Sequence, residues 1–181
     1  MLPELAFIVA HLSHHKVKNH EWNADSKREP MNVPIKEILK GALVVGGLDL
    51  LDAVVFFWVR NGVAPPRIFR SIAAGVLGRS ASTGGATAAT LGFVLQFVIA
   101  FLIVLTYWLL SRVIPIMRTR LLVSGVTFGI AAYFVMNYVV IPLSATTRGP
   151  FAWPVFLNGL AIHAFGVGLP AAWFGSRPRN P

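Results

Sequence analysis

The sequence predicts an all-α fold, an integral membrane bundle of four transmembrane helices with a short interfacial amphipathic helix between the first two. Of the 181 residues, 55% are hydrophobic and 13% are charged, and the mean hydropathy is +0.66. A soluble domain has about 25% charged residues. The chain also contains four nearly uncharged runs that approach or exceed the roughly 20 residues that cross a bilayer as a helix. These runs are too long and too continuously apolar for the strands of a membrane barrel.

Segments that are polar, basic or rich in proline and glycine separate the four expected spans. Lipid offers the backbone no hydrogen-bond partners, so each span is expected to be a helix. Pro142 is expected to end the third span, because proline cannot continue the hydrogen-bond ladder of a helix. The spans are expected at residues 38–59, 86–110, 121–141 and 154–174.

The joint between the first two spans contains the amphipathic segment. Ala64-Pro65-Pro66 is expected to break the chain after the first span. Residues 67–78 then place apolar side chains at helical spacing with arginines around them, and we interpret them as a helix lying at the membrane interface. The stretch 78–85, rich in glycine and serine, predicts a turn in which Thr83 or Thr87 could cap the second span.

Lysine and arginine are shared unevenly between the two sides of this arrangement. The side that holds both termini and the loop between the second and third spans has nine of them, and the other side has five. Because basic residues accumulate on the cytoplasmic side, we expect a bacterial inner (plasma) membrane protein with both termini in the cytoplasm. The net charge is +9. The basic residues lie at the ends of apolar runs, which favours anionic lipid headgroups over nucleic acid as their partner. The expected headgroup-binding residues are Arg67, Arg70, Arg79, Arg112, Arg118 and Arg120.

The first 33 residues differ in kind from the rest of the chain. Their apolar segment, residues 5–10, is too short to span a membrane, and residues 11–30 are polar and mixed in charge. Met31 would be a natural start just ahead of the first span. We therefore interpret residues 1–33 as a polar N-terminal extension, of which residues 1–30 are expected to precede the native start. The four-helix domain is expected at 34–176 and a cytoplasmic tail at 177–181.

Polar residues inside the expected spans form the candidate site. An ionisable residue in the middle of a bilayer costs about 2.5–3.5 kcal/mol on insertion scales, which makes it a functional candidate by default. Asp49, Gln96 and His163 each lie about ten residues inside their spans, which corresponds to a depth of about 15 Å, near the midplane. The expected site comprises Asp49, Asp52, Gln96, Asn137 and His163.

Small residues accompany these polar groups and allow helices to approach closely. One stripe of the second span contains Gly92, Gln96 and Ala100, and Gly125 and Gly129 form a GxxxG pair in the third. In the fourth span, one stripe is expected to contain Gly159, His163, Gly166 and Pro170.

Three interpretations of the polar site remain open. The polar groups could form a satisfied hydrogen-bond network that fixes helix register, at about 0.6–2 kcal/mol per contact. Alternatively, Asp49 and His163 could pair beside Gln96 as a site that binds a cation or relays a proton. A minor alternative is ligation of a pigment or haem by His163, since Gly159 leaves room for a flat ring. The spans contain no second histidine for a bis-histidine haem.

No enzyme signature is present in the sequence. It lacks HExxH, GxSxG, a P-loop and a Rossmann fingerprint, and without cysteine it has no thiolate chemistry. His11, His14 and His15 have helical spacing, but no carboxylate lies close enough in sequence to complete a metal site. The chain is therefore expected to be no enzyme and to have neither a metal site nor a cofactor.

Residues 90–170 resemble the small bacterial inner-membrane proteins of the YagU type. The second span closes with Tyr107, Arg112 and Pro115, and the third span contains Gly125 and Asn137 and closes with Pro142-Leu143, while His163 lies in the last span. That family has no established reaction, so the resemblance implies the architecture and an interest in His163 without an activity. At Asn137 the chain departs from the family pattern, which resembles a histidine at that position. A pair of histidines shared with the family is therefore not expected.

These observations favour an accessory or scaffold subunit of a membrane complex that assembles as a homo-oligomer or with larger partners. The alternative is a small proton-linked transporter or acid-responsive membrane protein that uses Asp49, Asp52 and His163.

Overall fold

The computed structural model describes residues 33–146 and 149–177, and their regular elements are helices. Within these residues, four helices are long and apolar enough to cross a membrane, as the sequence predicts. The chain is therefore a multi-pass membrane protein. The N-terminal extension, its histidines and most of the tail lie outside the described residues. The spans are α2 (Ile35–Asn61), α4 (Gly85–Val113), Leu121–Leu143 and Trp153–Gly175.

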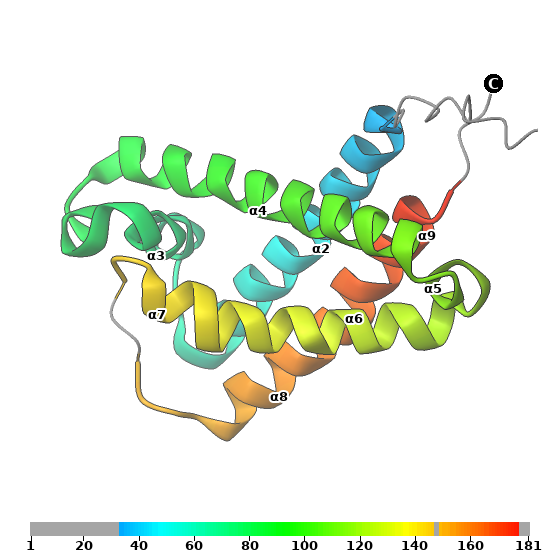
Figure 1. Ribbon diagram of the computed structural model, residues 1–181. Helices are drawn as coiled ribbons and strands as arrows, with labels where there is room; N and C mark the ends of the chain where they lie inside the picture. The colour runs from blue at the N-terminus through cyan, green and yellow to red at the C-terminus, as the bar shows by residue number, and fades with distance from the viewer. Residues whose placement is uncertain (1–32, 147–148, 178–181) are drawn as a thin grey trace, which may run out of the picture. The chain divides into compact units, whose positions relative to one another are not determined.

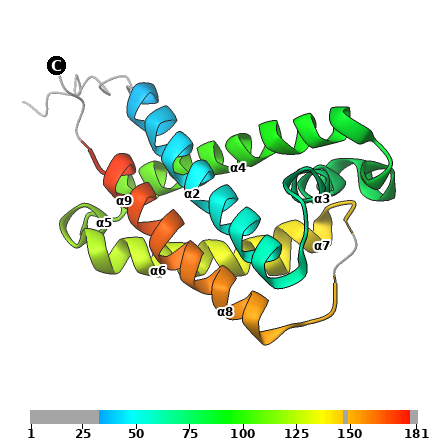
Figure 2. The same cartoon turned by 180° about the vertical axis from the view of Figure 1, so that it is seen from behind.

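The spans pack as two antiparallel pairs that lie against each other (Figures 1 and 2). Helix α2 packs along α4 and against α9 (Leu169–Gly175), and α6 (Leu121–Val135) packs along the fourth span. The start of α2, the end of α9 and the short α5 (Ile116–Thr119) between the second and third spans lie at one end of the bundle. The other end carries α3 and the end of the third span. This arrangement follows from four successive crossings, of which the first two are joined through α3 and η1.

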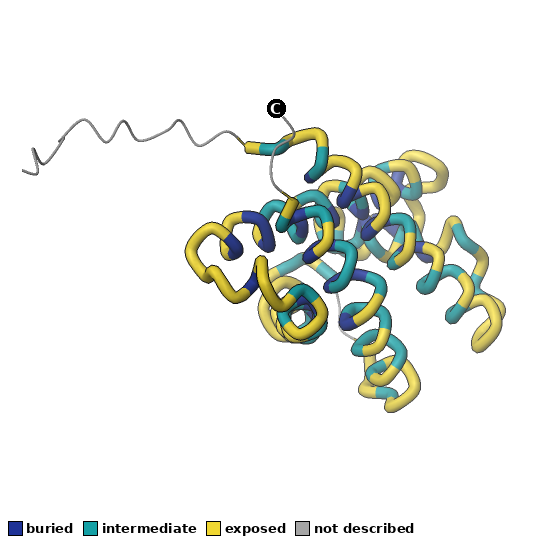
Figure 3. Tube along the Cα trace, turned by 90° about the vertical axis from the view of Figure 1, so that its right-hand side faces the viewer, coloured by how far each residue is buried: buried dark blue, intermediate teal, exposed yellow. Residues whose placement is uncertain are grey.

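The core lies where these helices meet, and apolar side chains also cover the outside. Tyr107, Val104 and Ile38 are fully buried at the centre of the main cluster. Large apolar side chains such as Leu43, 64% exposed, and Leu122, 73% exposed, point outward. Figure 3 shows the buried residues between the helices and the exposed ones around them. An exterior of this kind suits lipid, in which helix association depends on close packing and polar contacts.

Helix α3 (Pro65–Leu77) confirms the expected helix between the first two spans, although the prolines were expected to break the chain. Pro65 and Pro66 instead form its first turn, where a missing N–H costs nothing. Helix α3 packs along the first half of α4, and Gly92 lies directly against the carbonyl of Phe69. Helix α4 has 29 residues and is therefore about 43 Å long, more than the roughly 30 Å of a hydrocarbon core.

The connection from α3 to α4 differs from the predicted capped turn. Residues Gly78–Ser82 form a 3₁₀ helix, η1, and no side chain caps α4. The Thr83 hydroxyl donates to the Ser80 carbonyl oxygen, and Thr87 lies inside the first turns of α4. Neither hydroxyl is therefore placed at the N-terminus of α4 as a cap.

Each of the last two spans contains a π-helical segment. The third span runs through α6, η2 (Met136–Val140) and α7 (Ile141–Leu143), and the fourth through α8 (Trp153–Ile162), η3 (His163–Gly168) and α9. Each π segment ends two residues before a proline, Pro142 or Pro170, which cannot donate the N–H that an α-helix needs there. Pro142 was predicted to end the third span, but the helix continues for one more residue, to Leu143.

The third and fourth spans approach each other through glycines. A side chain at Gly129 would collide with the carbonyl of His163, and one at Gly168 would collide with the carbonyl of Gly125. The GxxxG pair therefore packs inside the chain, with the two backbones in contact. The predicted stripe on the fourth span shifts as a result, since Gly168 and not Gly166 makes this contact. The π segment places residues five apart, His163 and Gly168, on the same face.

Candidate functional site

Two carboxylates on α2 each accept a hydrogen bond from an amide side chain of another span. Gln96 Nε2 of α4 donates to Asp49 Oδ2 over 2.8 Å, and Asn158 Nδ2 of α8 donates to Asp52 Oδ2 over 2.7 Å. Asp49 and Asp52 are three residues apart, so they lie on one face of α2. This face thus joins the first span to both the second and the fourth.

Close packing of α2 and α4 places the first of these pairs. Gly46, one turn before Asp49, lies against Phe97 and Ala100 of α4. The two helices are antiparallel. Moving forward along α2 from Gly46 to Asp49 therefore corresponds to moving back along α4 from Ala100 to Gln96. Gln96 is only 8% exposed. A buried amide of this kind needs a partner, and the Asp49 carboxylate supplies it.

The second pair lies closer to the end of α2 and to the start of α8. Asp52 is nine residues before the end of α2, and Asn158 is five residues after the start of α8. Both side chains are half-buried. Asn158 is a polar residue of the fourth span that the predicted site leaves out. Its position near the same end as Asp52 is the signal by which sequence alone could have paired them.

His163 occupies a crowded position at the start of η3. Its Nδ1 lies 2.9 Å from the carbonyl oxygen of Gly159, and its ring meets the Tyr133 ring edge to face at 5.3 Å. A carbonyl oxygen only accepts hydrogen bonds, so Nδ1 carries the hydrogen in this contact. The Tyr133 ring also fills the space above Gly159, where a side chain would meet it at 2.7 Å. The room expected there for a flat pigment ring is therefore already occupied.

The remaining predicted site residue, Asn137, bonds within its own span. Asn137 Nδ2 donates to the carbonyl oxygen of Tyr133 over 3.0 Å, in the π segment η2. This hydrogen bond satisfies its own helix, and neither carboxylate receives it. Asn137 and His163 both lie in π segments, which often occur at functional sites.

The structure brings the acids and the histidine into one neighbourhood without the expected direct pair. Asp49 and Asp52 lie one turn apart on α2, and Asp52 accepts from Asn158, five residues before His163 on the fourth span. Within the described residues, Asp49 bonds Gln96 while His163 bonds Gly159, and the two make no ion pair. In that same part of the chain, no group of three histidine, cysteine, aspartate or glutamate side chains could hold a metal ion. The arrangement can fix helix positions, and its carboxylates can accept protons.

The predicted headgroup arginines lie in the connections and at one span end: Arg67 and Arg70 in α3, Arg79 in η1, and Arg112, Arg118 and Arg120 around the turn from α4 to α6. Five of the six are exposed and Arg70 is half-buried. The Arg112 guanidinium lies over the Trp108 ring, 5.8 Å from its centroid. The prediction omitted Arg177, which lies over Trp173 at 4.9 Å and Phe174 at 5.3 Å. The spacing of four between Trp173 and Arg177 could have indicated this contact, because such residues share a helix face.

Comparison of the chain with protein-family models, with curated proteins and with solved structures finds no match.

Proposed function

We propose that this four-span protein is a non-catalytic accessory or scaffold subunit of a bacterial inner-membrane complex, with both termini in the cytoplasm. The observation that carries the proposal is that each intramembrane carboxylate is bonded by an amide from another span, Asp49 by Gln96 and Asp52 by Asn158. Amide–carboxylate pairs of this kind fix how helices meet. They favour a fixed scaffold over a proton path.

The proposed orientation is supported by the basic residues at the span ends. The end of the bundle at which α2 begins carries Lys36 and Lys40, and α5 and its flanks add Arg112, Arg118 and Arg120. Positive charge of this density is typical of the cytoplasmic side. The resemblance to the YagU type also supports an inner-membrane location.

The exposed face of α2 supports assembly with another chain. Gly47 lies in the middle of α2, and an added side chain there would meet nothing within 4 Å. Leu43 and Leu51, one turn to either side, are 64% and 60% exposed. A small residue between large apolar ones is the pattern by which membrane helices approach each other. Apart from Gly85, the first residue of α4, the other glycines of the spans have neighbours within 4 Å of an added side chain, so this face is the one we assign to assembly.

A set of variants tests the scaffold role. Asp49→Asn removes the charge but keeps an oxygen that can accept from Gln96, whereas Asp49→Leu removes the acceptor. A scaffold keeps its expression, stability and assembly in the first variant and loses them in the second. Wild-type protein in liposomes should carry no proton flux above that of empty liposomes. Flux in the wild type that disappears in Asp49→Asn, with assembly intact, would contradict the proposal.

Assembly can be measured directly because the chain has no cysteine. Leu51→Cys should form an intermolecular disulfide in native membranes if α2 meets a second copy. The matched control is Leu102→Cys on α4, because Leu102 is 52% exposed. This variant should stay monomeric. A pull-down from native membranes would then identify a stoichiometric partner if the complex contains another chain.

A second candidate, an acid-responsive or proton-linked membrane protein, is favoured by one observation. Asp49 and Asp52 lie one turn apart on one face of α2, and each is bonded to an amide of another span. Protonation of a carboxylate would weaken its bond to the amide of another span and loosen the contact. His163→Gln would then abolish a response to acid while leaving assembly at neutral pH intact.

A further inference from the structure

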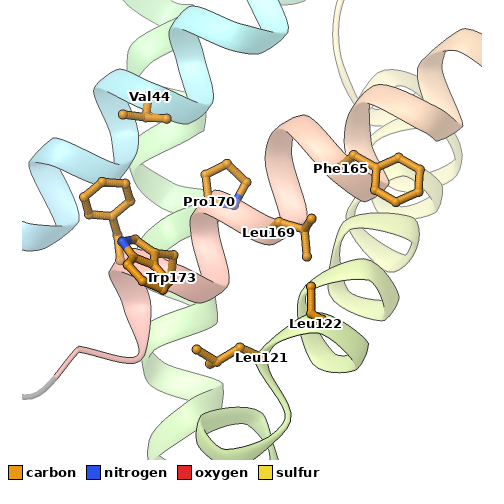
Figure 4. A pocket seen from close by; sticks show the side chains of 8 residues that line it. Val44, Leu121, Leu122, Phe165, Leu169, Pro170 and Trp173 are labelled. Carbon is orange, nitrogen blue, oxygen red and sulfur yellow. The ribbon is translucent and has the colours of Figure 1, made fainter.

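An open apolar groove runs along the fourth span at the end of the bundle where α2 begins. Its volume is about 610 Å³. Residues of η3 and α9 line it together with Val44 of α2 and with Leu121 and Leu122 at the start of α6. Figure 4 shows Phe165, Leu169 and Trp173 in succession along the groove. The groove is therefore bounded by three different spans.

The length of the groove matches one leaflet of a bilayer. Phe165, Leu169, Trp173 and Arg177 follow one another at intervals of four residues. The helix continues for ten residues from Phe165 to Gly175, which corresponds to a rise of about 15 Å, and half of a hydrocarbon core is also about 15 Å. Phe165 and Trp173 are 62% and 55% exposed. An acyl chain laid along this row would extend from near the midplane to the level of the headgroups.

Two cations stand where the headgroup of such a lipid would lie. Arg177 follows Trp173 by four residues, just beyond the end of α9 at Gly175, and Lys40 precedes Val44 by one turn on α2. Each groove wall thus leads to a basic residue, and the Arg177 guanidinium lies 4.9 Å from the Trp173 ring centroid. Glu37 holds the two cations together, since its Oε1 lies 2.7 Å from Lys40 Nζ and its Oε2 lies 3.6 Å from Arg177 Nη1.

Both cations keep free hydrogen-bonding capacity. A guanidinium has five N–H donors and an ammonium has three, and Glu37 takes only part of them. The Arg177 guanidinium is also fixed over the Trp173 and Phe174 rings. At this end the described residues carry six basic side chains and one acid, Glu37, so an anion is favoured. The basic ones are Lys36, Lys40, Arg112, Arg118, Arg120 and Arg177.

We infer that the groove is a binding site for an anionic phospholipid. One acyl chain lies along Phe165, Leu169 and Trp173, and the phosphate is held by Lys40 and Arg177. Basic pockets between transmembrane helices bind anionic headgroups in this way. The charge at the mouth selects the lipid, since any lipid could fill the apolar part. The inference goes beyond the scaffold role and rests only on the chain spanning a membrane.

Fluorescence quenching tests the site, because Trp173 lies inside it. A variant that keeps Trp173 and carries phenylalanine at the other four tryptophans is reconstituted with acyl-brominated lipids. We expect brominated phosphatidylglycerol to quench Trp173 with roughly fivefold higher apparent affinity than brominated phosphatidylcholine. Lys40→Gln with Arg177→Gln should bring that ratio close to one. Equal quenching by the two lipids before this change, or a ratio that survives it, overturns the inference.

A matched control separates the site from a general attraction to the surface. Trp58 is 57% exposed, close to the value of Trp173, and lies at the opposite end of α2. A variant that keeps only Trp58 should show a ratio near one, and a ratio as high as that of Trp173 overturns the inference. Trp173 shielded from both lipids would mean that a protein covers the groove, which also overturns it.

A second measurement uses the chain with all five tryptophans. After extraction from mixed phosphatidylcholine and phosphatidylglycerol nanodiscs, native mass spectrometry should find phosphatidylglycerol retained on the wild type. The Lys40→Gln, Arg177→Gln variant should lose it. Retention of phosphatidylcholine instead, or equal retention by both proteins, contradicts the inference.

Discussion

Gly129 of α6 lies directly against the backbone carbonyl of His163, so the third and fourth spans touch at the point where the π segment η3 begins. The candidate site and a direct backbone contact between two spans therefore share one position. Anything that separates these two backbones also moves the imidazole, because His163 is held to its own helix through Gly159.

Gly129→Ala should destabilise the protein strongly. The added methyl group would meet the His163 carbonyl and force the spans apart, at a cost of about 2 kcal/mol or more. For the chain as a monomer in detergent, Gly47→Ala is the control, because no other part of the chain lies within 4 Å of an added side chain there. It should be neutral or stabilise the helix by up to about 1 kcal/mol. Denaturant unfolding in detergent measures both, and equal stabilities of the two variants would refute the close contact.

The Asp52–Asn158 pair should behave as a coupled unit. Asn158→Leu leaves a carboxylate without its amide donor, whereas leucine at both positions removes both polar groups. We expect a coupling free energy of about 0.6–2 kcal/mol in a double-mutant cycle measured by unfolding in detergent. Additive effects of the two leucines would show that the hydrogen bond does not stabilise the bundle.

The turn between the second and third spans should depend on two hydroxyls together. Tyr107 Oη is 2.8 Å from the Met117 carbonyl oxygen and 2.9 Å from Ser124 Oγ, and Ser124 Oγ also lies 3.3 Å from that carbonyl. Tyr107→Phe should lower the unfolding free energy by about 0.5–1.5 kcal/mol, since Ser124 can still donate to Met117. Adding Ser124→Ala should cost more than the sum of the single changes. Strict additivity would mean that the two hydroxyls act independently.

The proposed topology predicts which cysteines an impermeant reagent reaches. Asn61→Cys at the end of α2 and Thr119→Cys in α5 replace exposed residues at opposite ends of the bundle. With both termini in the cytoplasm, a membrane-impermeant maleimide should label Asn61→Cys on intact cells. It should label Thr119→Cys only after permeabilisation. The reverse pattern would invert the orientation.

The spans could be predicted from the sequence because lipid imposes length and hydropathy directly on the chain. The ends could not be placed as well. Helix α2 begins at Ile35 and not at residue 38, since Lys36 and Glu37 are polar enough to look like a loop although a helix end tolerates them. The prolines after α2 were similarly interpreted as a break, while they begin α3.

The part of the site that lies outside the π segments could be predicted from the sequence. Depth alone placed Gln96 level with Asp49, and the structure joins them. A face calculated at 100° per residue fails beyond His163, because η3 adds residues to its turn. Gly166 was predicted to share a stripe with His163, and in the structure Gly168 meets α6 while an added side chain at Gly166 would lie 3.8 Å from Leu48 of α2. Each of the π segments η2 and η3 ends shortly before a proline, Pro142 or Pro170. A proline in a single sequence does not by itself predict a π-helical segment.

The 29 residues of α4 make membrane thickness a variable to which the protein must adapt. A helix longer than the hydrocarbon core tilts, thickens the bilayer around it or extends beyond it. Helix α3 packs along the first half of α4, so a tilt of α4 would carry α3 with it. A bilayer of long-chain lipids would bury more of α3 and the first half of α4. A thin bilayer would leave both exposed to water. Acyl-chain length is therefore a physical control on the position of α3.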